Sequence, residues 1–423
     1  MATECFALAR VRRMALGNDL RIDSMIDQLC EQRGLRWRQR LLWPAVFIRL
    51  FLLQILHGNT AIAHLRQLSG LDFAPSSYVQ ARCRLPLEVL KGLIGWLSST
   101  ARDLTREVIP TTRRVMIVDC SSFSMPDTPD LRKHFGLPKG RGVVEGVAYP
   151  VAKLVGLMDA ATGMFSRLLA CPLFTSDLRQ MRHVNPLLEI GDILLGDRAF
   201  CSFANIALLM GRGVDVVVRL HQRRKGQGRN GIVIWNRPET IPAWMTREQF
   251  MALPARLTIR LVSYQLEQRG FRTRNITIAT TLLDKREWSD EAISKLYNRR
   301  WSIETCFGHL KTTMGMAVLK CKTVAGVLKE LAAYLLVYNL VRLQMLQAAL
   351  RQQVDVNRIS FVDAARHLLA RMLGLPGVDR LIVNPLRPGR HEPRVIRRRP
   401  KPYTLMTRPR AQLKAKLAQG VTA

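Results

Sequence analysis

The hydrophobic and polar positions divide the chain into a helical first part and a mixed second part. Up to about residue 105, Leu, Ile and Trp recur at helical spacing through Leu52–Leu68 and Leu87–Leu97, with Gly58 and Gly70 as breaks. At Arg114 the pattern changes to short apolar runs rich in β-branched residues, which indicate buried strands. We therefore expect a helical domain at 1–105 and a different domain from about residue 110.

Two of the apolar runs end in an aspartate. VMIVDC contains Asp119 and DILLGD ends in Asp197, and the runs on either side of Asp159–Gly163 indicate a hairpin between them. Beyond Asp197, SFANIALLMGRG predicts a helix and VDVVVRL a further strand. A three-stranded meander, then alternating helices and strands, then a long helix is the order expected of an α/β (mixed α+β) protein with a ribonuclease-H-like catalytic core.

The segment from about 221 to 283 separates this core from the next helix. Its runs Arg256–Leu266 and Asn275–Leu283 indicate strands, and GQGRNG indicates a flexible turn, so we expect a β-rich insertion. Trp235 and Trp244 lie in it; each is interpreted as a core residue or as a platform for base stacking. We expect the catalytic domain to span 110–320, a helical region 321–385, and a basic, Pro-rich, flexible tail 386–423.

The stretch Tyr297–Lys311 concentrates polar side chains on one helical face. Ser289 with Asp290 and Glu291 suits a helix start, and offsets of three, seven and fourteen residues from Tyr297 nearly realign on an α-helix. The residues at those offsets are Arg300, Glu304 and Lys311. One interpretation is a solvated face with an ordinary ion pair; the other is a metal-binding carboxylate between side chains that hold phosphates.

The charge of the chain favours the second interpretation. Lys and Arg total 65 against 32 acidic residues, giving a net charge of +33 and a pI near 11. A surplus this large indicates a polyanionic partner, of which nucleic acid is the commonest and anionic lipid or an acidic protein the alternative. For the helices at 1–105, a DNA-binding domain and a dimerisation or packing module both remain open.

Nothing in the chain predicts a membrane span or an oxidising compartment. The apolar runs at 41–57 and 331–341 are short and interrupted, and the eight Cys include no CxxC pair. We expect a cytoplasmic, nucleoid-associated protein.

The pattern Tyr-x2-Arg-x3-Glu-x6-Lys at Tyr297, Arg300, Glu304 and Lys311 resembles the signature of the DDE transposases of bacterial insertion sequences, family four, in identity and spacing. VDCSSFSMPDTP around Asp119 and LLGDRAFCS around Asp197 are similar to the two aspartate motifs of that family, and SYVQARCRLP is similar to its amino-terminal region. The family commonly has Gly where this chain has Cys120, which is expected to alter the local turn. The resemblance extends from about Ser76 to Leu346.

The resemblance implies a set of site residues. Asp119, Asp197 and Glu304 would be the catalytic acids and would bind two divalent metal ions, Mg²⁺ or also Mn²⁺, for an in-line displacement at phosphorus. Tyr297, Arg300 and Lys311 would hold the DNA end, and Trp301 would pack beside a splayed base or in the core. At the end of VDVVVRL, Arg219 and His221 are further candidates for DNA contacts.

The expected function is therefore cut-and-paste transposition. The partners would be double-stranded DNA, as terminal inverted repeats and target, and a second copy of the chain in a synaptic homodimer. Two alternatives remain, a metal-dependent nuclease of the same fold without strand transfer and a catalytically inert DNA-binding remnant.

Overall fold

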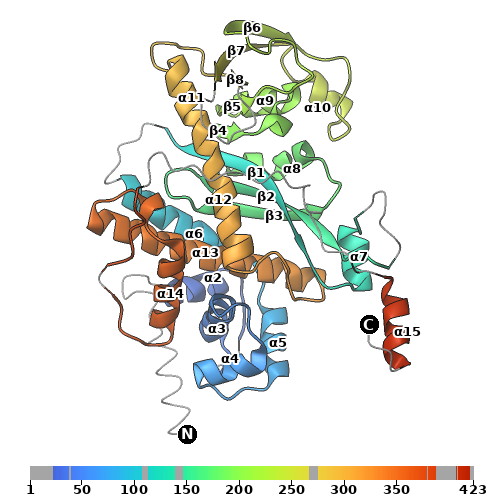
Figure 1. Cartoon of the computed structure of the whole chain (residues 1–423), viewed down its shortest axis with the longest axis vertical. Helices are drawn as coiled ribbons and strands as arrows, with labels where there is room; N and C mark the ends of the chain where they lie inside the picture. The colour runs from blue at the N-terminus through green and yellow to red at the C-terminus, as the bar shows by residue number, and fades with distance from the viewer. Residues whose placement is uncertain are drawn as a thin grey trace.

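A mixed eight-stranded sheet runs from the middle of the computed structural model to one end of the molecule (Figure 1). The structure describes residues 22–37, 40–106, 113–138, 146–265, 275–378, 380–386, 406 and 408–419. The start of the expected N-terminal domain, at 1–21, and most of the expected tail, at 387–405, lie outside the described residues.

The strand order is β3-β2-β1-β4-β5-β8-β7-β6. β1 (Val115–Ser124), β2 (Val151–Asp159) and β3 (Phe165–Pro172) form an antiparallel meander, while β4 (Ile193–Gly196) and β5 (Asp215–Arg219) run parallel to β1. This meander with two parallel strands beside its first strand is the arrangement expected of a ribonuclease-H-like core, so that prediction is confirmed.

The strands expected of the β-rich insertion extend the same sheet. β8 (Asn275–Thr280) pairs with β5, β7 (Arg256–Gln265) with β8, and β6 (Gly231–Asn236) with β7. Trp235 on β6 is only 8 % exposed, and the Arg224 guanidinium lies 3.8 Å from its ring centroid. Trp235 is therefore a core residue, and the base-stacking interpretation is wrong for it because its ring is already covered.

Alternating residues of the strands face two different cores. Met116 and Val118 pack with α8 (Asp177–Val184) and α9 (Phe203–Met210), whereas Ile117 packs with helices on the other face. That other face carries α6 (Leu87–Arg106), α12 (Ser302–Gly308) and α13 (Val324–Gln352). α13 is long and apolar enough to cross a membrane, but its most apolar window is 78 % buried inside the protein, as expected of a core helix.

The N-terminal helices pack around α3 (Pro44–Leu56), at the end of the molecule opposite β6 (Figure 1). They are α2 (Ile22–Glu31), α4 (Ile62–Ser69) and α5 (Pro75–Arg84). Buried Glu330 of α13 accepts hydrogen bonds from the Asn59 side chain at 2.7 Å and from the Cys321 amide at 2.8 Å. A buried carboxylate is costly unless its oxygens are hydrogen-bonded, and the Asn59 side chain supplies one of these bonds. This contact joins the N-terminal helices to α13.

Shorter elements complete the described chain. α7 (Pro129–Phe135) follows β1, α10 (Arg247–Met251) lies between β6 and β7, and α14 (Phe361–Met372) packs on α13. The last helix, α15 (Arg410–Ala418), docks through Arg410, which pairs with Asp127 and donates to the Ala148 carbonyl at 2.7 Å. Within the expected tail, Arg410–Ala418 therefore form a helix whose first residue pairs with a nearly buried carboxylate.

Candidate active site

Two of the predicted acids belong to neighbouring parallel strands, since Asp119 lies on β1 and Asp197 directly follows β4. β1 pairs with β4 with Ile117 opposite Leu195, so that Asp119 and Asp197, each two residues further on, occupy equivalent places. The Cys120 amide donates to Asp119 Oδ1 at 2.8 Å, and the Ala199 amide donates to Asp197 Oδ1 at 2.8 Å. One oxygen of each carboxylate is thus held by a backbone amide, and the second oxygen of Asp119 faces Arg300 Nη1 at 3.2 Å.

The Tyr297–Lys311 stretch is not the single α-helix that the sequence predicts. α11 (Asp290–Asn298) passes into a 3₁₀ turn at Arg299–Trp301, then α12, then a π-helical turn at His309–Thr313. The π turn is closed by the Met314 amide bonding to the His309 carbonyl at 2.9 Å. Such turns are frequent at functional sites, and here the turn contains Lys311.

The His309 ring stacks on Phe361 of α14, with ring centroids 4.2 Å apart and planes at 7°. Burial lowers the pKa of this imidazole to about 4, so it is neutral at physiological pH. The π turn is therefore held against α14 by an uncharged aromatic contact.

Arg300 links the strand acid to the helix acid. Its Nη1 lies 3.2 Å from Asp119 Oδ2, and its Nη2 lies 3.2 Å from Glu304 Oε1. The Arg300 side chain is 8 % exposed, Asp119 16 % and Glu304 50 %, so the Asp119 contact is the more desolvated of the two. The guanidinium also lies 4.6 Å from the Trp301 ring centroid and 5.9 Å from that of Tyr297.

The three acids share one electrostatic environment. Burial raises the pKa of Asp119 to about 6, the Cys120 amide and Arg300 oppose this rise, and the charges of Asp197 and Glu304 add to it. Asp119 is thus ionised at neutral pH only against a desolvation cost, which a cation at the same place would relieve.

The other signature residues occupy different surroundings. Tyr297 is 2 % exposed, and burial raises the pKa of its hydroxyl to about 12, with Arg300 and Arg219 nearby. Lys311 Nζ donates to Ser121 Oγ at 3.2 Å, and burial lowers the pKa of its ammonium. Trp301 is 38 % exposed. Ser121 lies two residues beyond Asp119, so Arg300 and Lys311 reach the same face of β1.

Cys120 points to the opposite face of β1. The strand continues without a turn to Ser124, so the expected alteration of the turn does not occur. Lys153 and Asp177 lie near the Cys120 thiol, whose pKa is raised by burial. The thiol therefore does not line the site.

Gly156 is a residue that sequence reasoning missed. It lies opposite Asp119 in the β1–β2 pair, and a Cβ there would come within 2.8 Å of Phe307 and 2.8 Å of Phe165. Its missing side chain lets Phe307 of α12 pack closely on the sheet, which brings Glu304 toward Asp119. No periodicity or motif in the sequence marks this role.

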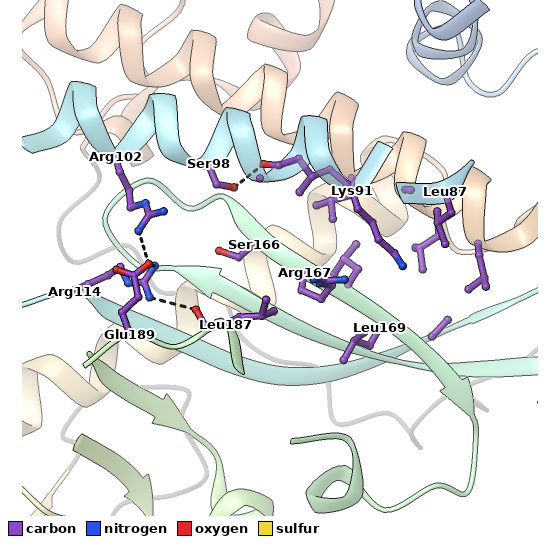
Figure 2. Close-up of a pocket in the computed structure, with 18 residues that line it drawn as sticks. Leu87, Lys91, Ser98, Arg102, Arg114, Ser166, Arg167, Leu169, Leu187 and Glu189 are labelled. Atoms are coloured by element: carbon purple, nitrogen blue, oxygen red, sulfur yellow. Dashed lines mark hydrogen bonds and ion pairs between the residues drawn. The ribbon is translucent and has the colours of Figure 1, made fainter. Parts of the chain in front are cut away.

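A separate hollow of about 400 Å³ lies between α6, β3 and α13 (Figure 2). Three of its ionic groups are engaged with one another, since Arg102 donates to Glu189 Oε1 at 2.9 Å and Arg114 lies 3.2 Å from the same atom. None of the three acids lines it, so the hollow is not part of the candidate active site.

The donor set suits a hard divalent cation, although the acids are not gathered tightly. Among the described residues, no three acidic, His or Cys side chains form a group that could hold a metal ion. Asp119, Asp197 and Glu304 offer only carboxylate oxygens, the ligands that Mg²⁺ and Mn²⁺ favour, and Arg300 supplies the positive charge between two of them. The three carboxylates are therefore suitable ligands for such an ion, provided that Arg300 gives up its contacts with Asp119 and Glu304.

Comparison with known proteins identifies the family. The model described as "Transposase DDE domain" matches residues 110–340, which include all three acids and the four signature residues. The chain belongs to the DDE transposase family. It is accordingly an enzyme that cleaves DNA and transfers strands, and the resemblance seen in the sequence is confirmed.

Among the individual proteins similar to this transposase are two other transposases. The Escherichia coli (strain K12) transposase InsG for insertion sequence element IS4 is 25 % identical over 361 residues, covering 78 % of each chain. A piggyBac transposase in a synaptic complex with hairpin DNA aligns with a TM-score of 0.45 and 10 % identity, covering 86 % of this chain and 80 % of that one.

Proposed function

We propose that this transposase performs cut-and-paste transposition, with Asp119, Asp197 and Glu304 as its catalytic acids and as the ligands of two Mg²⁺ or Mn²⁺ ions. The proposal is carried by one observation: acids from two in-register strands and one helix are coupled, two of them through one guanidinium. A pair of divalent ions would stabilise the entering and leaving oxygens of an in-line displacement at phosphorus.

The protein's own part is to position the acids and to balance their charge. The backbone amides at Cys120 and Ala199 hold one oxygen each of Asp119 and Asp197. Arg300 balances part of the negative charge of Asp119 and Glu304, and we propose that it turns to a DNA phosphate when cations bind. Tyr297 packs beside Arg300, whose guanidinium lies 5.9 Å from its ring centroid, and Lys311 reaches the same face of β1 at Ser121.

DNA would then cross the open side of this site. Lys311 and Arg300 are proposed to contact the backbone of the transposon end, and half-exposed Trp301 to pack beside a displaced base. Tyr297 is too buried for a direct contact without movement, so we assign it to holding Arg300. The active assembly is proposed to be a homodimer that pairs two ends, in a nucleoid-associated protein of the bacterial cytoplasm.

The test is a joining reaction. Full-length protein is incubated with Mg²⁺, labelled duplexes carrying the element's ends and a supercoiled target plasmid. Wild type is expected to nick the ends and to join them to the plasmid. Glu304→Gln should abolish both steps and retain end binding, because the amide keeps the shape of the side chain without its charge.

Glu287→Gln serves as the matched control, because Glu287 is also an exposed glutamate on the described chain. Normal cleavage by Glu304→Gln would contradict the catalytic assignment. If wild type cleaves the ends but forms no joined product, the nuclease alternative is favoured. If wild type binds the ends but does not cleave them, the catalytically inert DNA-binding remnant is favoured.

A further inference from the structure

α4 and α5 are arranged as a helix-turn-helix. α4 ends at Ser69, Gly70 closes it in the left-handed conformation at a φ of 67°, and α5 begins at Pro75 after a five-residue turn. Only Tyr78 and Ala81 of the ten residues of α5 are buried. A second helix that follows a short Gly-containing turn and keeps most of its surface free is the form of helix that enters the major groove of DNA.

The inner side of α5 is firmly anchored. The Tyr78 ring packs against Phe47 with centroids 5.1 Å apart, and its hydroxyl donates to Gln54 Oε1 at 2.8 Å. At the other end, Lys329 of α13 donates to the carbonyls of Arg82 and Cys83, each at 2.8 Å. α5 is thus a rigid element joined to the catalytic part of the chain through α13.

The outer side of α5 carries polar groups suited to reading bases. Ser77, Gln80 and Arg84 follow at offsets of three and seven residues, so they share one face, and all three are exposed. In the major groove, glutamine can form hydrogen bonds with both N6 and N7 of adenine, and arginine with both O6 and N7 of guanine. In the described part of the chain, no hydrogen bond or ion pair to another side chain engages Gln80 or Arg84.

A cationic cleft runs along the same side of α5. Its volume is about 710 Å³, and its lining includes Arg36, Arg40 and Arg84 together with Ser77 and Gln80. Asp72 is the one acid among its lining residues, and it is paired with Arg66. The local charge is therefore positive, which suits a phosphate backbone and disfavours a basic surface such as a second copy of this +33 chain.

We propose that α5 is a DNA-recognition helix that reads the major groove of the element's terminal repeats. Gln80 and Arg84 contact base edges, Ser77 supports them, and Arg36 and Arg40 hold the flanking phosphates. This inference rests on the proposed function only in taking the element's ends as the DNA that is read.

The experiment measures binding without catalysis. Full-length protein in EDTA is titrated into a fluorescent duplex carrying the element's genomic end and into a shuffled duplex of the same composition, with anisotropy as the readout. Gln80→Ala and Arg84→Ala are expected to weaken binding of the end duplex about tenfold each and to reduce the preference over the shuffled duplex. Arg36→Ala should weaken both duplexes alike and lower the slope of log affinity against log salt by about one.

Gln28→Ala is the matched control, since Gln28 is an exposed glutamine on α2, whose neighbours Asp27 and Glu31 are acidic. Thermal unfolding and light scattering of each variant show that fold and assembly are kept. End binding by Gln80→Ala and Arg84→Ala equal to that of Gln28→Ala overturns the inference, as does a loss caused by a changed oligomeric state.

The two proposals can fail separately. Wild type that prefers the end duplex through Gln80 and Arg84 but forms no joined product would leave the recognition helix standing and remove the proposed function. If wild type forms joined products while Gln80→Ala and Arg84→Ala bind the end duplex normally, the proposed function would stand and the recognition helix would be overturned.

Discussion

Replacing Arg300 by Met tests whether the guanidinium is the counter-ion of the strand acid. The substitution keeps an unbranched side chain between Tyr297 and Trp301 and removes the charge that lies 3.2 Å from Asp119 and 3.2 Å from Glu304. Since Asp119 is largely buried, its carboxylate loses its nearest compensating cation. The metal-free protein is therefore expected to be destabilised at neutral pH.

The magnitude follows from distance and burial. At an effective dielectric of about 20, opposite charges about 4 Å apart attract by about 4 kcal/mol. Met has no guanidinium to desolvate, which offsets part of the lost attraction. Loss of the contact with Glu304 adds little because that carboxylate is 50 % exposed. We expect the free energy of unfolding to fall by about 2 kcal/mol near pH 8.

The sign of the pH dependence comes from Asp119. Its folded pKa of about 6 lies above its unfolded value, so the folded protein binds the proton more tightly and loses stability as pH rises toward 6. Without Arg300 this pKa rises further, so the stability difference between Arg300→Met and wild type grows with pH. Near pH 5, Asp119 is protonated in both proteins and the difference should shrink to less than about 1 kcal/mol.

Urea unfolding in EDTA at the two pH values measures this difference, with Asp119→Asn and the double variant completing a cycle. In the double variant, Arg300→Met should cost less than in wild type because the carboxylate charge is gone. An equal loss at both pH values, or strictly additive single variants, would refute the counter-ion role of Arg300.

Three further results are expected. Lys311→Ala should weaken end binding and lower the salt slope by about one, whereas exposed Lys285→Ala should not; an unchanged slope would argue against a phosphate contact. Gly156→Ala should destabilise the fold by roughly 1–3 kcal/mol and impair cleavage because its methyl group meets Phe307, whereas Gly95→Ala, with open space around it, should be tolerated. Mg²⁺ near pH 8 should raise the unfolding temperature of wild type but much less that of Asp119→Asn, and an equal rise in both would place the metal elsewhere.

The sequence alone determined the class of protein and its chemical groups. Apolar runs ending in Asp119 and Asp197 predicted strands because alternation and β-branching are local properties, and the charge of +33 indicated a polyanion. The pattern from Tyr297 to Lys311 predicted a shared face, and that face does reach β1, although through 3₁₀ and π turns. Backbone turns of this kind are set by packing, here by the stack of His309 on Phe361.

Only the tertiary structure decided how those groups meet. The pairing of Ile117 with Leu195 brings the two aspartates together across 78 residues of sequence, and no local pattern encodes such a register. Likewise, the contact of Arg300 with Asp119, the close approach at Gly156 and the docking of Arg410 join positions distant along the chain. Each of these contacts depends on which surfaces are buried together. A charged side chain that loses its water on burial is stable only when an opposite charge or a hydrogen-bonding group lies beside it.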